Sequence, residues 1–226
     1  MKNAGILGGI GPQATLSFYC RFIDVCQLKH SGIYPNLIIN SIETWKNASL
    51  VGKPDKLLVH LKEEVDKIQH QVDVLAIVCN TMHSLITELR EYARIPILAI
   101  HEEVAKEVDI AKCHKVGLLG TKSTLENEFY QSELDKYSIS SVVLPDHYED
   151  ELDELVFKNV LYGKGFDQMR LKLSECALEL EKQNVDGIIL ACTEFPLFIT
   201  QDDVSVRLFS STSILADNLV EYLFDV

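Results

Sequence analysis

The sequence repeats itself at a spacing of half its length, and this repeat constrains the fold more than any other feature. Three short motifs recur in one order at an offset of 112 or 113 residues: Gly5-Ile6-Leu7-Gly8 as Gly117-Leu118-Leu119-Gly120, Val72-Asp73 as Val185-Asp186, and Cys79-Asn80-Thr81 as Cys192-Thr193-Glu194. Matches in the same order at nearly one offset indicate a duplication, so the two halves are expected to form lobes of similar architecture.

Short apolar runs alternate with longer amphipathic stretches along the whole chain. The apolar runs predict strands at 4–9, 36–42, 73–79, 95–99, 115–119, 140–144, 186–192 and 206–209. Helical patterns lie between them at 12–29, 53–70, 81–93, 101–111, 124–136, 148–160, 166–183 and 212–224. Continuous apolar runs are typical of strands buried on both faces of a parallel sheet, and strand–helix alternation predicts an α/β fold with right-handed crossovers.

These patterns predict two pseudo-symmetric lobes with an active site in the cleft between them. Each lobe is expected to hold a mostly parallel four-stranded sheet flanked by helices. We place residues 1–98 and 210–226 in the N-terminal lobe and residues 99–209 in the C-terminal lobe. No linker rich in Pro, Gly or Ser divides the chain.

The charge of the chain narrows the classes of partner. Asp and Glu number 34 against 21 Lys and Arg, which gives a formal net charge of −13 and disfavours nucleic acid and anionic membranes. No apolar run reaches the roughly 18 residues of a membrane helix, and the N-terminus lacks a signal-peptide core. We therefore expect a cytoplasmic protein whose six cysteines are thiols, because no pair has CxxC spacing.

Two of the cysteines, Cys79 and Cys192, end apolar strands at equivalent positions of the repeat. Ligands of open α/β sheets bind beyond the carboxyl ends of the strands, where both thiols are expected. A helix beginning after each cysteine would bind a carboxylate and lower the thiol pKa. The alternative is that both are buried core thiols, and the other four cysteines, which lack such a setting, are interpreted as structural: Cys20, Cys26, Cys113 and Cys176.

Two thiols facing one substrate suit the inversion of a stereocentre by proton transfer. One group removes a proton from one face, and the second delivers a proton to the other face. The carboxylate beside the carbanion then needs N–H donors, which the two helix N-termini would supply.

Four segments of the chain together resemble the aspartate/glutamate racemase family. They are Gly8-Gly9-Ile10-Gly11-Pro12-Gln13-Ala14-Thr15, Cys79-Asn80-Thr81-Met82-His83, Gly117-Leu118-Leu119-Gly120-Thr121 and Ala191-Cys192-Thr193-Glu194. The resemblance implies racemisation of an acidic amino acid without PLP or metal, with Cys79 and Cys192 as the acid/base pair. It also implies two similar α/β lobes and a homodimer. The substrate-binding residues expected with the two cysteines are Gly9, Ile10, Asn80, Thr81, Thr121, Lys164, Thr193 and Glu194.

One segment departs from the family. Aspartate racemases of this kind usually carry an Arg after the second strand that meets the side-chain carboxylate, whereas this chain has Ser41-Ile42-Glu43-Thr44-Trp45-Lys46-Asn47. Lys46 is a candidate replacement, although a solvated loop lysine is the favoured interpretation, and Tyr162-Gly163-Lys164-Gly165 resembles the family's other cationic contact more closely. The choice between aspartate, glutamate and a broader range therefore stays open.

Other interpretations of the same residues compete with this one. Gly9-Ile10-Gly11-Pro12-Gln13-Ala14 imitates a dinucleotide fingerprint, although Pro12 removes an N–H that a pyrophosphate would need. Cys79, His83 and Cys192 could form a zinc set that lacks a close fourth ligand. Further alternatives are hydantoin racemisation, maleate isomerisation or arylmalonate decarboxylation on the same scaffold, and a non-catalytic two-lobed protein that binds a small acid.

Overall fold

The computed structural model describes residues 1–43, 50 and 52–225, and the chain forms two compact units. The first comprises Met1–Glu103 and Thr212–Val226, and the second comprises Val104–Ser211. The first segment of this unit ends at 103, within helix α5 (Ile100–Ile110), where the expected boundary was 98, and its second segment begins at 212 where 210 was expected. The shift has a packing reason, because Ile100 at the start of α5 is fully buried in a core of the first unit.

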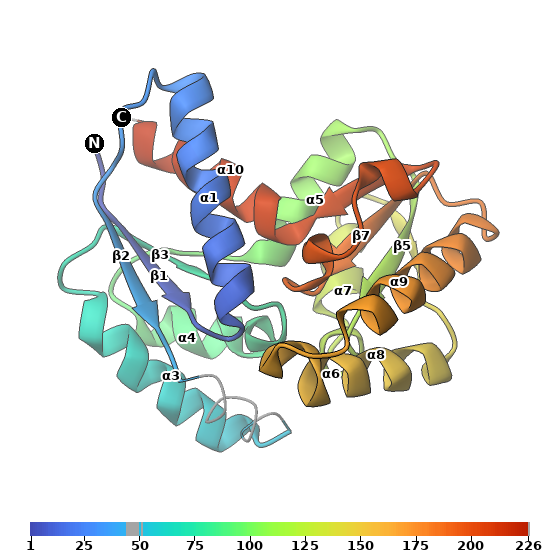
Figure 1. The fold of residues 1–226 in the computed structure, drawn as a ribbon. Helices are drawn as coiled ribbons and strands as arrows, with labels where there is room; N and C mark the ends of the chain where they lie inside the picture. The colour runs from blue at the N-terminus through green and yellow to red at the C-terminus, as the bar shows by residue number, and fades with distance from the viewer. Residues whose placement is uncertain (44–49, 51, 226) are drawn as a thin grey trace. The chain divides into compact units, whose positions relative to one another are not determined.

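The first unit is built on a parallel four-stranded sheet in the order β2-β1-β3-β4. The strands are β1 (Ala4–Gly8), β2 (Leu37–Ser41), β3 (Val74–Ile77) and β4 (Ile97–Leu98). Its longer helices are α1 (Pro12–Lys29), α3 (Pro54–Ile68), α4 (Ile86–Tyr92) and α10 (Ser211–Phe224). Helices α1 and α10 cover one face of the sheet, and α3 and α4 cover the other (Figure 1).

Side chains of the central strands alternate between two cores, as the pleat of a strand requires. Leu7 and Ile77 pack with α3 and α4, whereas Ile6 and Ala76 pack with α1 and α10. Both faces are apolar because both are covered, which explains why the sequence shows continuous apolar runs and no alternation with polar residues.

The second unit repeats the topology of the first. Its sheet has the order β6-β5-β7-β8 and is also parallel throughout. The strands are β5 (Lys115–Gly120), β6 (Ser140–Val142), β7 (Gly187–Ala191) and β8 (Arg207–Ser210). The helices are α6 (Lys122–Leu125), α7 (Phe129–Asp135), α8 (Asp146–Lys158) and α9 (Phe166–Glu181), and α8 and α9 pack on one core of the sheet. The predicted α/β fold with two four-stranded parallel sheets is confirmed.

One repeated motif has a structural role in both units. Asp73 accepts a hydrogen bond from the Asn3 N–H at 2.7 Å, and Asp186 accepts from the N–H groups of His114 and Lys115 at 2.7 and 2.9 Å. These backbone donors hold the pKa of the Asp186 carboxyl below its usual value. The aspartate that precedes the third strand of each unit thus fixes the entry to the first strand.

Two of the predicted helices are interrupted. The pattern over 81–93 forms a 3₁₀ helix η1 (Thr81–Leu85) followed by α4. The pattern over 124–136 is divided between α6 and α7 at Glu128, which adopts a left-handed conformation with φ 53°. Apolar periodicity persists through both breaks, so the sequence pattern does not reveal them.

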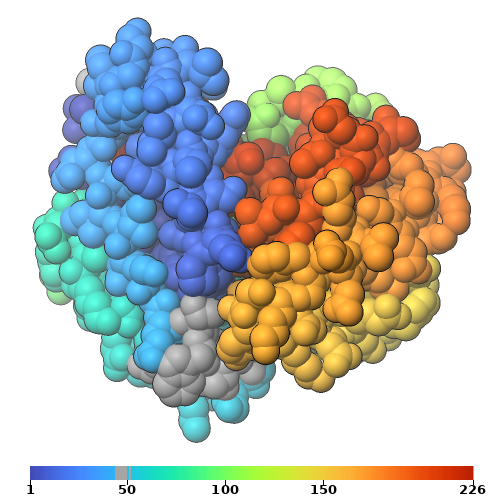
Figure 2. Space-filling view, in the orientation of Figure 1, coloured from blue at the N-terminus to red at the C-terminus, as the bar shows by residue number. Residues whose placement is uncertain are grey.

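Helix α1 lies at the surface of the first unit, in blue in Figure 2. Phe18 and Phe22 are buried on its inner side, whereas Leu16 and Tyr19 on its outer side are 62% and 39% exposed. Within the described part of the chain, no helix has the length and apolar character needed to cross a bilayer.

Candidate active site

Cys79 follows the carboxyl end of β3 in the first unit. The Val78 N–H donates to the Leu7 carbonyl at 2.9 Å, so the chain stays attached to β1 up to the residue before the thiol. Cys79 and Asn80 are 8% and 2% exposed, and Thr81 begins η1 immediately after them. This arrangement agrees with the expected position of the thiol beyond a central strand.

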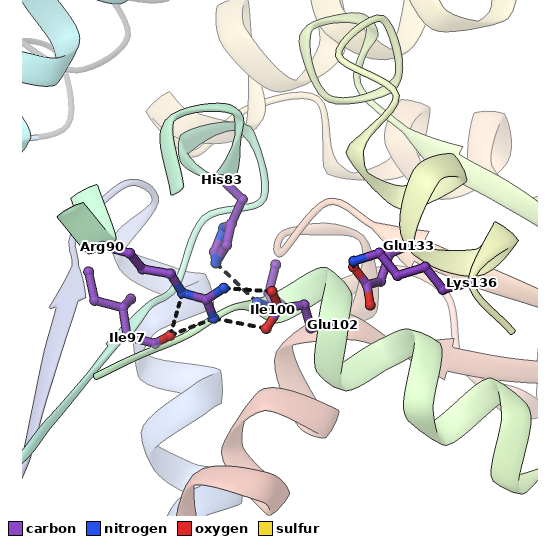
Figure 3. Close-up of polar contacts among 7 residues, drawn as sticks. All are labelled: His83, Arg90, Ile97, Ile100, Glu102, Glu133 and Lys136. Carbon is purple, nitrogen blue, oxygen red and sulfur yellow. Dashed lines mark hydrogen bonds and ion pairs between the residues drawn. The ribbon is translucent and has the colours of Figure 1, made fainter. Parts of the chain in front are cut away.

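His83 is held on both sides by the backbone. Its Nδ1 lies 2.9 Å from the Cys79 carbonyl oxygen. Its Nε2 accepts the Ile100 N–H at 3.0 Å (Figure 3). Burial, reinforced by His101, lowers the pKa of His83 to about 3, so the ring is neutral at physiological pH. Because both ring nitrogens are engaged, His83 is not available as the zinc ligand considered from its spacing to Cys79.

Cys192 follows β7 at the equivalent place in the second unit, but no long helix begins after it. A turn leads into the three-residue 3₁₀ helix η3 (Phe195–Leu197), and Phe195 is fully buried beneath it. The expectation of a helix N-terminus beside Cys192 is therefore wrong, because Phe195 enters the core and the backbone turns after one short segment. A helix dipole does not provide the electrostatic setting of this thiol.

A carboxylate provides that setting instead. The Cys192 thiol donates to Glu194 Oε2 at 3.5 Å, and the Thr193 hydroxyl donates to the same oxygen at 3.0 Å. All three residues are buried, with Glu194 only 4% exposed. A carboxylate that accepts from a buried thiol can take the proton of that thiol and return it.

Tyr130 lies near Cys192, and the sequence patterns did not predict it as a site residue. It is fully buried on α7 and hydrogen-bonded to Ser211, at the start of α10. Burial raises its pKa, and the nearby Cys192 raises it further, so Tyr130 stays protonated as a hydroxyl. Its position in an apolar helical pattern is typical of a core residue, and no sequence signal marks its proximity to the thiol.

The glycine-rich turn after β1 is braced by Thr15. The Gly9 N–H donates to Thr15 Oγ1 at 2.8 Å, and the Thr15 hydroxyl donates to the Gly11 carbonyl at 3.2 Å. Gly9 has a φ of +84°, and Ile10 is 9% exposed. This use of the Gly9 N–H, together with Pro12 at the first turn of α1, removes donors that the dinucleotide interpretation would need.

The remaining predicted residues lie in different settings. Thr121 follows β5 with 1% exposure, and its hydroxyl lies 3.1 Å from that of Thr124. Lys164 is exposed in the turn before α9, between two glycines of positive φ, and not at a strand end. Lys46, the other cation considered for the side-chain carboxylate, lies outside the described residues.

The predicted residues thus form one group in each unit. The first unit holds Gly9, Ile10, Cys79, Asn80 and Thr81, all after the carboxyl ends of β1 and β3. The second unit holds Thr121, Cys192, Thr193 and Glu194 after β5 and β7, whereas Lys164 lies in the turn before α9, between β6 and β7 in the chain.

The other four cysteines differ from this pair. Cys20 is exposed on α1, and burial raises the pKa of the three remaining thiols, those of Cys26, Cys113 and Cys176. For Cys176 the pKa rises to about 12. These settings agree with the structural roles expected for the three buried thiols.

Comparison with known proteins identifies the family. The sequence profile described as Asp/Glu/Hydantoin racemase matches residues 7–219. The chain belongs to this family. It is 28% identical to the broad specificity amino-acid racemase RacX of Bacillus subtilis over 221 residues, covering 96% of each chain. This racemase family is a family of isomerases, so the chain is an enzyme of that class and the non-catalytic alternative is excluded.

Solved structures of the family share the fold. An aspartate racemase homologue from Pyrococcus horikoshii is 30% identical, with a TM-score of 0.81 and 99% of each chain covered. The aspartate racemase of Picrophilus torridus is 19% identical, with a TM-score of 0.81 and coverage of 99% of this chain and 94% of the other. The second likeness concerns the fold alone.

Proposed function

We propose that this racemase interconverts the enantiomers of an acidic amino acid, aspartate or glutamate, by two-base proton transfer through Cys79 and Cys192. The observation that carries the proposal is the buried hydrogen bond from the Cys192 thiol to Glu194 at 3.5 Å. A thiol with its own proton acceptor can deliver a proton to Cα in one direction and be regenerated as a base in the other.

The two cysteines occupy equivalent positions but have different neighbours. The repeat aligns Thr81 with Glu194, so only Cys192 has a carboxylate two residues farther along the chain. Cys79 is instead associated with His83 through its own carbonyl group. In the proposed mechanism each thiol transfers protons at one face of Cα. The thiols at the two faces therefore have different neighbours.

The other groups have binding roles in this proposal. Asn80, Thr81, Thr121 and Thr193, with Gly9, Ile10 and Glu194, would contact the α-carboxylate and α-amino group of the substrate. Lys164 is proposed to anchor the side-chain carboxylate, because a chain with a net charge of −13 needs a local cation to bind a dianion. The reaction needs neither PLP nor a metal, since two thiols supply both proton transfers.

The first experiment measures racemisation of L- and D-aspartate, L- and D-glutamate and neutral amino acids by chiral chromatography, with EDTA and without added PLP. We expect turnover of at least one acidic amino acid, and a loss of turnover in Cys79→Ser and in Cys192→Ser. Cys20→Ser is the matched control, because Cys20 is exposed and lies outside both site groups. Full activity in either of the first two variants contradicts the two-base mechanism.

Hydrogen exchange in D₂O resolves the two half-reactions. An equilibrium constant of one forces kcat/KM to be equal in both directions, so rates of racemisation cannot assign a thiol to an enantiomer. Exchange of the Cα proton can assign it: Cys192→Ser should exchange only one enantiomer, and Cys79→Ser only the other. Glu194→Gln should slow by about tenfold the exchange that depends on Cys192, since an amide oxygen cannot take up the proton of the thiol as a carboxylate can. Equal slowing for both enantiomers contradicts the role of Glu194.

A further inference from the structure

His83 connects three segments of the first unit that are distant in the chain. It lies on η1, its Nδ1 lies 2.9 Å from the carbonyl oxygen of Cys79, and its Nε2 accepts from the N–H of Ile100 at the start of α5. The ring is 1% exposed, so water does not substitute for either partner. Both contacts are therefore part of the folded structure on the Cys79 side of the site.

The partners fix the tautomer of the ring. A backbone N–H can only donate, so Nε2 must carry a lone pair where it meets Ile100. A carbonyl oxygen can only accept, so the single ring proton lies on Nδ1 and is donated to Cys79. Protonation of Nε2 would place two N–H groups against each other, which agrees with the low pKa of about 3 that burial gives this ring.

The anchor at Ile100 is itself rigid. The Arg90 guanidinium donates to the Ile97 carbonyl at 3.1 and 2.8 Å and to the Glu102 carboxylate at 2.6 and 2.8 Å (Figure 3). These bonds hold the connection between β4 and α5 on both sides of Ile100. The start of α5 thus holds the His83 ring in place, and the ring in turn holds the carbonyl group of Cys79.

The orientation of this carbonyl has a consequence for the next residue. In a planar trans peptide the C=O and the following N–H point in opposite directions. Because the Cys79 carbonyl is turned toward His83, the Asn80 N–H is turned away from it. The same peptide also sets the direction in which the Cys79 side chain leaves the backbone.

We propose that His83 is a positioning residue, which as a neutral imidazole fixes the Cys79–Asn80 peptide and thereby the direction of the Cys79 thiol. The proposal rests on the proposed function only for its catalytic consequence. His83 exchanges no proton with the substrate, because both of its nitrogens are engaged with the backbone.

Two conservative variants separate the two bonds. In His83→Asn the amide nitrogen overlays Nδ1 and keeps the donor to Cys79, whereas in His83→Gln the amide oxygen overlays Nε2 and keeps the acceptor for Ile100. Each variant loses one hydrogen bond, so the two melting temperatures should fall by similar amounts. We expect kcat/KM to fall about tenfold or more in His83→Gln and by less than about threefold in His83→Asn, since a small misplacement of a reacting group is costly. Equal losses in the two variants would overturn the proposal.

Two further measurements do not depend on racemisation. In a Cys20→Ser background, the iodoacetamide rate constant of Cys79 should match the wild type in His83→Asn and differ from it in His83→Gln. The ¹⁵N NMR spectrum of the imidazoles should show His83 protonated on Nδ1 and unchanged between pH 5 and pH 8 (roughly the range in which an ordinary histidine titrates). A proton on Nε2, or identical alkylation rates in the two variants, refutes the role of His83. If the wild type racemises no amino acid, the proposed function fails, while these measurements still decide the role of His83.

Discussion

Replacing Gly9 by alanine should destabilise the first unit far more than the same change at another glycine of positive φ. A Cβ on Gly9 would lie 2.3 Å from the carbonyl oxygen and 2.5 Å from the nitrogen of Ile42. Both are backbone atoms, so no side-chain rotation relieves the contact. The chain after β2 must move, and it then loses the hydrogen bond from the Ile42 N–H to the Gly8 carbonyl, which is 2.9 Å long.

The expected cost has three contributions. A left-handed conformation costs an alanine about 1–2 kcal/mol, the lost hydrogen bond about 1 kcal/mol, and the displaced backbone about 1 kcal/mol or more. The reduced entropy of the unfolded chain returns about 0.4–1 kcal/mol, which leaves a net loss of about 3 kcal/mol. Gly32 is the matched control in the same unit: its φ is +74°, but its nearest neighbour is the Tyr34 hydroxyl at 3.8 Å, so only the conformational cost applies.

Thermal and urea unfolding followed by circular dichroism measure this difference. At about 2–4 °C per kcal/mol for a chain of this size, Gly9→Ala should lower the melting temperature by about 6–12 °C and Gly32→Ala by about 2–4 °C. Equal shifts would refute the argument, because they would mean that the backbone beside Gly9 moves at no cost.

Three other predictions concern titratable groups. Burial raises the pKa of the Cys176 thiol to about 12, and its side chain is fully buried, so iodoacetamide should label the exposed Cys20 and leave Cys176 unmodified in the folded protein. Comparable labelling of the two thiols would contradict the burial of Cys176. The pKa of Asp186 is lower in the folded chain than its unfolded value of about 3.9, so its carboxylate stabilises the fold above that value, and this stabilisation is lost as the pH falls through the folded pKa. Asp186→Asn should therefore lower the urea midpoint at pH 7 and approach the wild type near pH 3. A penalty independent of pH would refute this role. Burial and then Asp146 raise the pKa of Glu149, so its effect on stability is opposite to that of Asp186: the charged form of Glu149 destabilises the fold at pH 7. Glu149→Gln should therefore raise the urea midpoint at pH 7 and lose that advantage as the pH falls. A lower midpoint at pH 7 would contradict this prediction.

The sequence by itself determined the architecture. Apolar runs bounded by turn residues predicted the strands found in the described part of the chain, and the repeat predicted two lobes of similar architecture, whose sheets share one strand order in the structure. These features are local or periodic: continuous apolar runs follow from sheets covered on both faces, and a duplication leaves the same motifs at one offset. The positions of Cys79 and Cys192 after central strands followed from the same patterns.

The contacts that define the chemistry of each thiol were decided only by the tertiary structure. His83 meets Ile100, which is 17 residues away in the sequence, because η1 and α5 pack together in the first unit. The chain after Cys192 turns at once, because Phe195 enters the core, and so Glu194 faces the thiol where a helix N-terminus was expected. Apolar periodicity indicates which face of an element is buried, but hydrogen bonds between elements depend on distances that the fold alone sets.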